Sequence, residues 1–202
     1  MTIGQYRAFD WYDESGHLLD DSVPYTSITL DEDGQYTFSD TRNKLTVYSC
    51  DTSAVILDAT GTSGSGCFSY CCDDINFTAE SYCSGYGCCQ TSIPKSLRSL
   101  HIFMNSSTNY TSVQDFSSCG STFLVDQDSF NVSDYRLPVP DDMLVEKCSN
   151  VVLDWVVERD FTCKEAQSNR LCYSCGANGF CSDFRNGRGY LCFCDAGYKG
   201  NP

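Results

Sequence analysis

The chain has little positive charge and no long apolar run, and each absence excludes a class of function. Its 202 residues contain 13 basic against 27 acidic side chains, for a formal net charge of −14. A chain this acidic repels nucleic acid and anionic membrane surfaces. No stretch approaches the roughly 18 consecutive apolar residues of a membrane-spanning helix. We therefore expect no nucleic-acid partner, and contact with a membrane only through a segment outside this chain.

Sequence motifs for catalysis and phosphate binding are also missing. A nucleophile elbow, Gly-x-Ser-x-Gly, fails at Ser65, and a phosphate-binding glycine loop fails at Gln90. The two histidines, His17 and His101, are expected in a turn and beside a strand rather than as general bases. The carboxylate spacing of a glycosidase depends on the fold, and no acidic pair stands out. We expect no catalytic residue and no enzyme activity in this chain.

A secretion leader is absent from the start of the sequence, although other features indicate an oxidising compartment. Cysteine makes up 15 of the 202 residues, close to the level that signals a disulfide framework. Acceptor sites for N-glycosylation, Asn-x-Ser/Thr, occur at Asn76, Asn105, Asn109 and Asn131. An odd cysteine count leaves one cysteine without a partner in the chain. These observations together favour an extracellular piece of a longer protein.

Zinc is the main rival of disulfides for the cysteines. Cys172 and Cys175 have the spacing of a zinc ligand pair, but Cys192 and Cys194 are one residue too close for a zinc ribbon. With glycosylation acceptors present, disulfides are favoured. We expect no metal and no cofactor.

The pattern of apolar residues is typical of a mostly β fold. Alternation over residues 25–38, interrupted by the turn 31–34, predicts a β-hairpin, and residues 61–66 are predicted to form a flexible loop. The run 151–157 is rich in β-branched residues and predicts a buried strand. Residues 163–202 then carry six cysteines and little aliphatic content. We expect a cysteine-rich β domain over 1–162 and a small disulfide-stapled module over 163–202.

The stretch 83–95 concentrates three cysteines, Cys83, Cys88 and Cys89. Adjacent side chains diverge, so Cys88 and Cys89 should pair with different partners. Gly85 and Gly87 would allow tight turns between Cys83 and the adjacent pair. This predicts a local disulfide knot in a crowded surface loop.

Scarce basic residues form two small groups that could contact an anionic ligand. Arg42 and Lys44 flank a predicted strand, and Lys95, Arg98 and His101 follow the pair Ile93-Pro94 at spacings of three. A solvated surface is the simpler interpretation, and a polyanion site is the alternative.

The C-terminal sequence resembles an EGF-like module. Its pattern is Cys172-x-x-Cys175-Gly-Ala-Asn-Gly-x-Cys181, followed by Gly189-Tyr190-Leu-Cys192-Phe-Cys194 and Gly197-Tyr198-Lys-Gly200-Asn-Pro. The resemblance implies bridges Cys172–Cys181 and Cys175–Cys192, with Cys194 awaiting a sixth cysteine beyond Pro202. The acidic run that marks calcium-binding modules is absent before Cys172, so no calcium is expected.

Together with this ending, the stretch Cys83-Ser-Gly-Tyr-Gly-Cys-Cys-Gln-Thr-Ser-Ile-Pro-Lys95 is similar to the ectodomains of plant wall-associated receptor kinases. Residues 38–51, 66–71 and 152–155 match further motifs of that family, so the resemblance spans about residues 26–202. The family's N-terminal cysteine-containing segment, transmembrane helix and Ser/Thr kinase have no counterpart in this sequence.

The resemblance implies a non-catalytic extracellular fragment of a single-pass membrane receptor, located on the apoplast side of the plasma membrane. Its implied ligand is cell-wall pectin (galacturonan), and its implied output is an attached kinase. The alternatives are an ectodomain that recognises a protein or peptide in plant defence and a secreted structural glycoprotein. A glycosidase is the least favoured.

Overall fold

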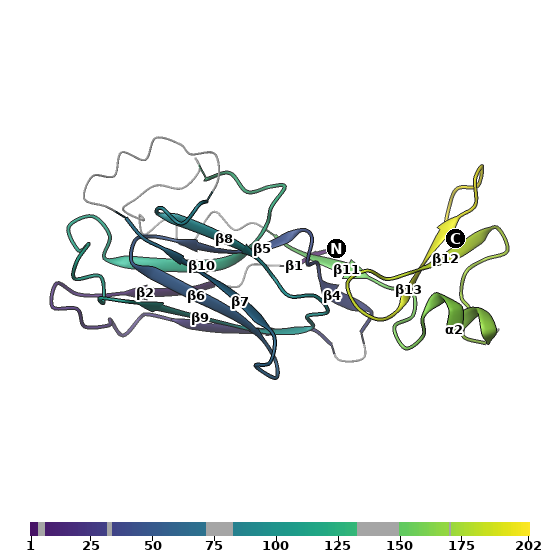
Figure 1. Cartoon of the computed structure of the whole chain (residues 1–202), viewed down its shortest axis with the longest axis horizontal. Coiled ribbons are helices and arrows are strands. Elements are labelled where there is room, and N and C mark those ends of the chain that lie inside the picture. Colours follow the sequence, from purple (N-terminus) through teal and green to yellow (C-terminus); the bar gives the residue numbers. More distant parts are fainter. Residues whose placement is uncertain (4–6, 32–33, 72–82, 133–149, 170) are drawn as a thin grey trace.

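The computed structural model describes residues 1–3, 7–31, 34–71, 83–132, 150–169 and 171–202. Within these residues it is mostly β, as predicted, with one short helix and five disulfides (Figure 1). No helix among these residues is long and apolar enough to cross a membrane.

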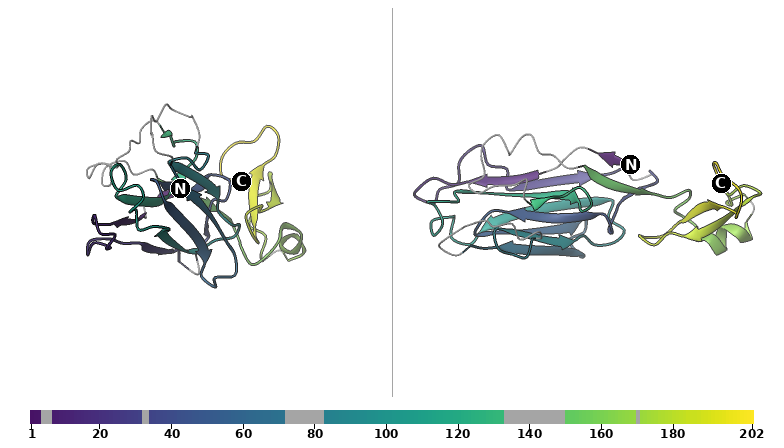
Figure 2. Two further views of the ribbon diagram at one scale, coloured as in Figure 1. Left: turned by 60° about the vertical axis from the view of Figure 1, so that its left-hand side comes forward. Right: turned by 90° about the horizontal axis from the view of Figure 1, so that it is seen from above.

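Two four-stranded antiparallel sheets pack face to face. One has the order β2 (Arg7–Trp11), β10 (Cys119–Asp126), β5 (Asn43–Tyr48) and β8 (Cys88–Ser92). The other has the order β3 (Tyr25–Thr29), β9 (Ser99–Ser106), β6 (Thr52–Asp58) and β7 (Gly64–Ser69). The layers are seen edge-on in the right-hand view of Figure 2.

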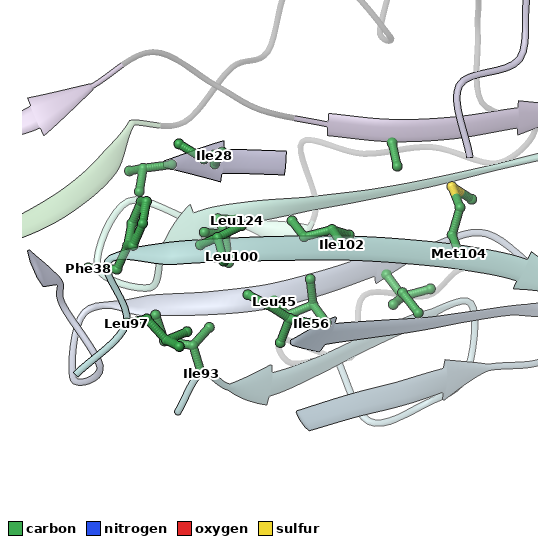
Figure 3. Packing of buried hydrophobic residues seen from close by; sticks show 14 of the residues in the cluster. Ile28, Phe38, Leu45, Ile56, Ile93, Leu97, Leu100, Ile102, Met104 and Leu124 are labelled. Atoms are coloured by element: carbon green, nitrogen blue, oxygen red, sulfur yellow. The ribbon is translucent and has the colours of Figure 1, made fainter. Parts of the chain in front are cut away.

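The core of this sandwich follows from the two-residue period of its strands. In β9, Leu100, Ile102 and Met104 are buried, whereas the residues between them face outward. They pack against residues of the other sheet such as Leu45 and Leu124, as Figure 3 shows.

A third sheet lies beside the sandwich and corrects the predicted hairpin. It has the order β1 (Thr2–Ile3), β11 (Val151–Trp155) and β4 (Tyr36–Phe38). Both predicted strands of 25–38 exist, but β3 pairs with β9 and β4 pairs with β11. Alternation identifies a strand and its buried face but does not identify its partner. Here β3 and β4 pair with strands of two different sheets. The predicted strand at 151–157 is confirmed as β11, which ends at Trp155.

Two predicted loops are partly strands. Gly64 and Gly66 belong to β7, which pairs with β6. A Cβ at Gly64 would lie 2.7 Å from the carbonyl oxygen of Ile56, so the glycine permits this close pairing. Within the stretch 83–95, residues 88–92 form β8 at a sheet edge, and Cys88 is buried. The partner of β7 is the preceding strand β6, whereas β8 pairs with the more distant β5.

The disulfides of the sandwich confirm that the adjacent cysteines have different partners. Cys88 pairs with Cys83, and Cys89 pairs with Cys67 of the opposite sheet. Gly85 and Gly87, with φ of 108° and 67°, make the turns predicted for them. A further bridge joins Cys50 to Cys71.

The C-terminal region, yellow-green in Figure 1, contains α2 (Cys163–Ser168), β12 (Gly179–Asp183) and β13 (Tyr190–Cys194). It extends from one end of the sandwich in all views (Figures 1 and 2). The strands form a two-stranded antiparallel sheet, and the side chain of Tyr190 is fully buried against α2 and the disulfides.

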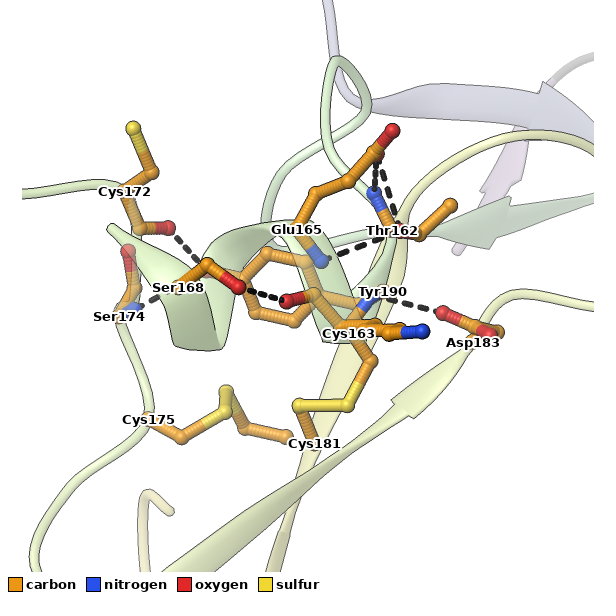
Figure 4. Close-up of a disulfide and its surroundings, with 12 residues drawn as sticks. Thr162, Cys163, Glu165, Ser168, Cys172, Ser174, Cys175, Cys181, Asp183 and Tyr190 are labelled. Atoms are coloured by element: carbon orange, nitrogen blue, oxygen red, sulfur yellow. Dashed lines mark hydrogen bonds between the residues drawn. A yellow bond between two sulfur atoms is a disulfide. The ribbon is translucent and has the colours of Figure 1, made fainter. Parts of the chain in front are cut away.

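One implied disulfide of this region is wrong. Cys175 pairs with Cys192 as implied, but Cys181 pairs with Cys163 instead of Cys172 (Figure 4). A capping box between Thr162 and Glu165 starts α2 at Cys163. The backbone N–H of Cys163 donates to Asp183 at 2.7 Å, which brings it beside β12. Counting the module's first cysteine at 172 rather than at 163 caused the error.

Candidate functional site

A pocket of about 460 Å³ lies at the end of the sandwich that faces the C-terminal region. Its walls are the end of β3, the β6–β7 turn, the segment 95–99 that leads into β9, and Arg159 after β11. This volume is within the ~300–1,000 Å³ range of ligand sites. Three basic side chains line it, those of Lys95, Arg98 and Arg159.

Lys95 supplies the most accessible positive charge of the pocket. Its side chain is exposed, and its ammonium group donates at 3.4 Å to the backbone carbonyl of Arg185. Among the described residues it makes no ion pair. The next residue, Ser96, has a positive φ of 63° and donates its backbone N–H to the Asn186 side chain at 2.8 Å. The C-terminal region therefore fixes the backbone that carries Lys95.

Arg98 combines a structural and an electrostatic role. Its guanidinium donates to the carbonyl oxygen of Gly34 at 2.8 Å and to that of Asp31. These bonds brace the turn between β3 and β4 against the start of β9. Because an arginine stays charged, the braced side chain still contributes positive potential to the pocket.

Among the described residues two carboxylates oppose these cations, because Asp160 lies 3.9 Å from the guanidinium of Arg159 and Asp58 lines the pocket. Asp58, in the β6–β7 turn, accepts hydrogen bonds from the hydroxyl groups of Thr60 and Thr62. Desolvation acts to raise its pKa, but these hydrogen bonds outweigh it and hold the pKa below its ordinary value. The described part of the pocket wall therefore carries three positive charges and the negative charge of Asp58, and Asp160 pairs with Arg159 beside it.

The structure brings together two of the five predicted ligand residues, Lys95 and Arg98. Arg42 instead pairs with Asp126 at 2.6 Å and Asp128 at 3.0 Å. Lys44 donates to Ser92 at 2.8 Å, and the imidazole of His101 lies 2.7 Å from the hydroxyl of Tyr25. None of these three lines the pocket. Arg159 was missed because it is distant in sequence and reaches the pocket only through the packing of the chain after β11.

The predicted glycosylation sites fall in different environments. Asn105 and Asn131 are exposed, and Asn109 is exposed with its amide nitrogen 3.1 Å from the carbonyl oxygen of Gly16. Asn76 lies outside the described residues. Glycosylation at these positions stays a prediction.

A buried polar cluster between β2 and β10 had no signal in the sequence. Asp10 is fully buried and accepts hydrogen bonds from the Tyr110 hydroxyl at 2.9 Å and the Gly120 backbone N–H at 3.1 Å. Burial raises the pKa of Asp10 to about 6. Its second carboxyl oxygen has no hydrogen-bond partner within the described part of the chain. Because the cluster has no exposed acidic atom, we assign it to the core rather than to a binding site.

Comparison with known proteins identifies the family to which this chain is similar. The family model described as wall-associated kinase matches residues 80–162. Wall-associated receptor kinase 2 of Arabidopsis thaliana is 32% identical over 207 residues, covering 100% of this chain and 26% of the relative. Wall-associated receptor kinase 1 of the same plant is 32% identical over 205 residues, covering 97% and 25%. No solved structure matches.

The chain thus spans about a quarter of the length of the curated relatives that it matches. The similarity to these relatives extends through both the sandwich and the C-terminal region, and the family model covers the stretch 83–95 that first suggested the family. The chain is a wall-associated-kinase-like ectodomain.

Proposed function

We propose that this chain is the wall-contacting part of a receptor on the apoplast side of the plasma membrane. In this proposal it binds the acidic cell-wall polysaccharide pectin (polygalacturonate) in the pocket of Lys95, Arg98 and Arg159. A Ser/Thr kinase in another part of the full-length protein then receives the signal. The names of the relatives, wall-associated receptor kinases, support the setting.

The observation that carries the proposal is the local reversal of charge. The chain as a whole has a net charge of −14 and repels a polyanion. The described pocket nevertheless collects three of its 13 basic residues against two acidic residues, Asp58 in its wall and Asp160 beside Arg159. A carboxylated sugar chain would therefore be attracted to this end of the molecule and repelled elsewhere, which orients the ligand.

The shape of the pocket limits how much ligand it holds. Its volume of about 460 Å³ suits a short segment of a sugar chain rather than a long one. Lys95 would pair with a uronate carboxylate, and the half-buried apolar side chain of Leu30 would contact the C–H face of a sugar ring. Such exposed ion pairs contribute little individually and weaken with salt.

Calorimetric titration with a short oligogalacturonate tests the proposal. We expect weak binding at low ionic strength, a loss of binding on adding salt, and no binding of an uncharged oligosaccharide of equal length. Lys95→Gln should lower the affinity several-fold. Lys199→Gln is the matched control, because it removes the same charge from an exposed site outside the pocket. No binding at low salt, or equal effects of the two substitutions, would refute the proposal.

A further inference from the structure

The outer face of the β3–β9–β6–β7 sheet carries an apolar row that the other described residues leave partly exposed. Tyr25, Phe103 and Val55 lie side by side on neighbouring strands. They are 42%, 45% and 43% exposed, and the rings of Tyr25 and Phe103 are 4.9 Å apart. We call these three residues the apolar row. A contiguous apolar row of this kind gains free energy when another group covers it.

Asn105 lies on the same face, two positions beyond Phe103 on β9. Side chains two residues apart on a strand point to the same side and are separated by about 7 Å. Asn105 is exposed, and its carboxamide makes no hydrogen bond to any described residue. It also begins an acceptor sequence, Asn105-Ser106-Ser107. By contrast, the amide of Asn109 donates to Gly16.

We propose that Asn105 carries an N-linked glycan whose first N-acetylglucosamine packs on Phe103 and covers the apolar row. The C–H face of a pyranose ring is apolar and matches the face of an aromatic ring. The short link from Asn105 holds the sugar beside Phe103 at a high effective concentration. The covering group is therefore supplied by the chain's own modification rather than by a partner protein.

The covalent step is a transfer of a preassembled oligosaccharide from a lipid diphosphate in the secretory pathway. The side-chain nitrogen of Asn105 forms a bond to the anomeric carbon of the first sugar. The bond between that carbon and the diphosphate oxygen breaks, the lipid diphosphate leaves with the bonding electrons, and the amide loses one proton. No oxidation or reduction takes place.

This inference is independent of polysaccharide binding. Asn105 and the pocket residue Ser99 are at opposite ends of β9, about 20 Å apart for six residues of strand. A glycan at Asn105 therefore leaves the pocket open. Loss of one property would not entail loss of the other.

The test uses the chain secreted from a eukaryotic host. Glycopeptide mass spectrometry should find Asn105 occupied. After trimming the glycan to a single N-acetylglucosamine, we expect a Tm about 2–4 °C above that of Asn105→Gln, the size that a modest contact gives in a chain of this length. Repeating the pair in a Phe103→Thr background should reduce the difference to less than 1 °C.

Two controls keep the test decisive. Asn109→Gln removes a glycan site whose neighbour two residues earlier is Ser107, so its effect should not depend on Phe103. Phe103→Leu, which keeps an apolar side chain without a flat ring, replaces Phe103→Thr if that variant does not fold. An unmodified Asn105 overturns the proposal, and so does a Tm difference that is unchanged when the ring is removed.

Discussion

The sandwich and the C-terminal region of this chain reach stability by different means. The sandwich buries a continuous apolar cluster drawn from both large sheets, including Leu45, Ile56, Ile102 and Leu124. The buried cluster of the C-terminal region consists of Ala166, Cys175, Cys181 and Tyr190. A region this small gains too little from apolar burial, so covalent links must replace the missing core. Each prediction below breaks or sharpens this contrast.

The largest effect should follow from removing a disulfide of the C-terminal region. Cys175→Ser with Cys192→Ser should cost about 2–5 kcal/mol of local stability and unfold residues 163–202 while the sandwich stays folded. Hydrogen exchange measured by mass spectrometry would locate the loss. The matched control removes Cys67–Cys89, which lies against the apolar cluster of the sandwich, and should leave most strands protected. Equal loss of protection in both regions would contradict the contrast.

The next effect concerns the pH dependence of the sandwich. The pKa of Asp10 is about 6 in the folded chain and 3.8 as the ordinary value, so the folded state retains a proton that the unfolded state releases. Stability should therefore fall as pH rises from about 4 to about 6. Above this range the free energy of unfolding should be about 3 kcal/mol lower than below it, for a pKa shift of this size. Asp10→Asn should remove this fall, as measured by urea denaturation at several pH values.

Asp51 provides the control of opposite sign. Desolvation acts to raise its pKa, but hydrogen bonds from Ser106 and Thr108 outweigh it, and the pKa is lowered. Its contribution is present above the ordinary pKa and is lost as pH falls below it. Asp51→Asn should therefore change the profile at acidic pH only. A profile of Asp10→Asn that matches the unmodified chain would show that Asp10 does not control the range from 4 to 6.

The smallest effect should come from the contact between the two regions. Asn186 is 2% exposed and donates to the Phe38 carbonyl at 2.8 Å and the Asp154 carboxylate at 3.0 Å. It also accepts from the Ser96 backbone N–H. Asn186→Ala leaves these groups unpaired, at a cost of about 1–3 kcal/mol. We expect a larger radius of gyration by X-ray scattering, with the internal structure of each region retained.

Asn178→Ala is the matched control for Asn186, since Asn178 is exposed in the same region. It should leave the scattering profile unchanged. Asn186→Ala should also weaken oligogalacturonate binding, because Asn186 holds the backbone next to Lys95. If scattering is the same for both variants, the two regions are held together by other contacts.

The strands were predictable where burial alternates along one segment. Leu100, Ile102 and Met104 alternate with polar or exposed residues, and the strand at 151–155 is rich in β-branched residues. Gly64 and Gly66 were assigned to a loop because glycine is common in loops. Their place in β7 depends on the close approach of β6, which no local pattern records.

The candidate site was only half predictable. Lys95 and Arg98 follow each other closely in sequence, so their grouping survives folding. Arg159 joins them from a segment more than 60 residues away, whereas Arg42 of the other predicted group pairs with Asp126 and does not line the pocket. Scarcity of basic residues marked the candidates, but their neighbours depend on which segments fold beside them.

By itself, the sequence determined a mostly β, disulfide-rich chain, the separate partners of Cys88 and Cys89, and the resemblance to wall-associated kinase ectodomains. The first two follow from composition, strand period and side-chain direction, and the resemblance rests on short motifs such as the stretch 83–95; all of these are local properties. The tertiary structure decided that β3 and β4 belong to different sheets, that Cys181 pairs with Cys163, and that Lys95, Arg98 and Arg159 share one pocket. These depend on contacts between distant segments, and such contacts are fixed only when the whole core is buried together.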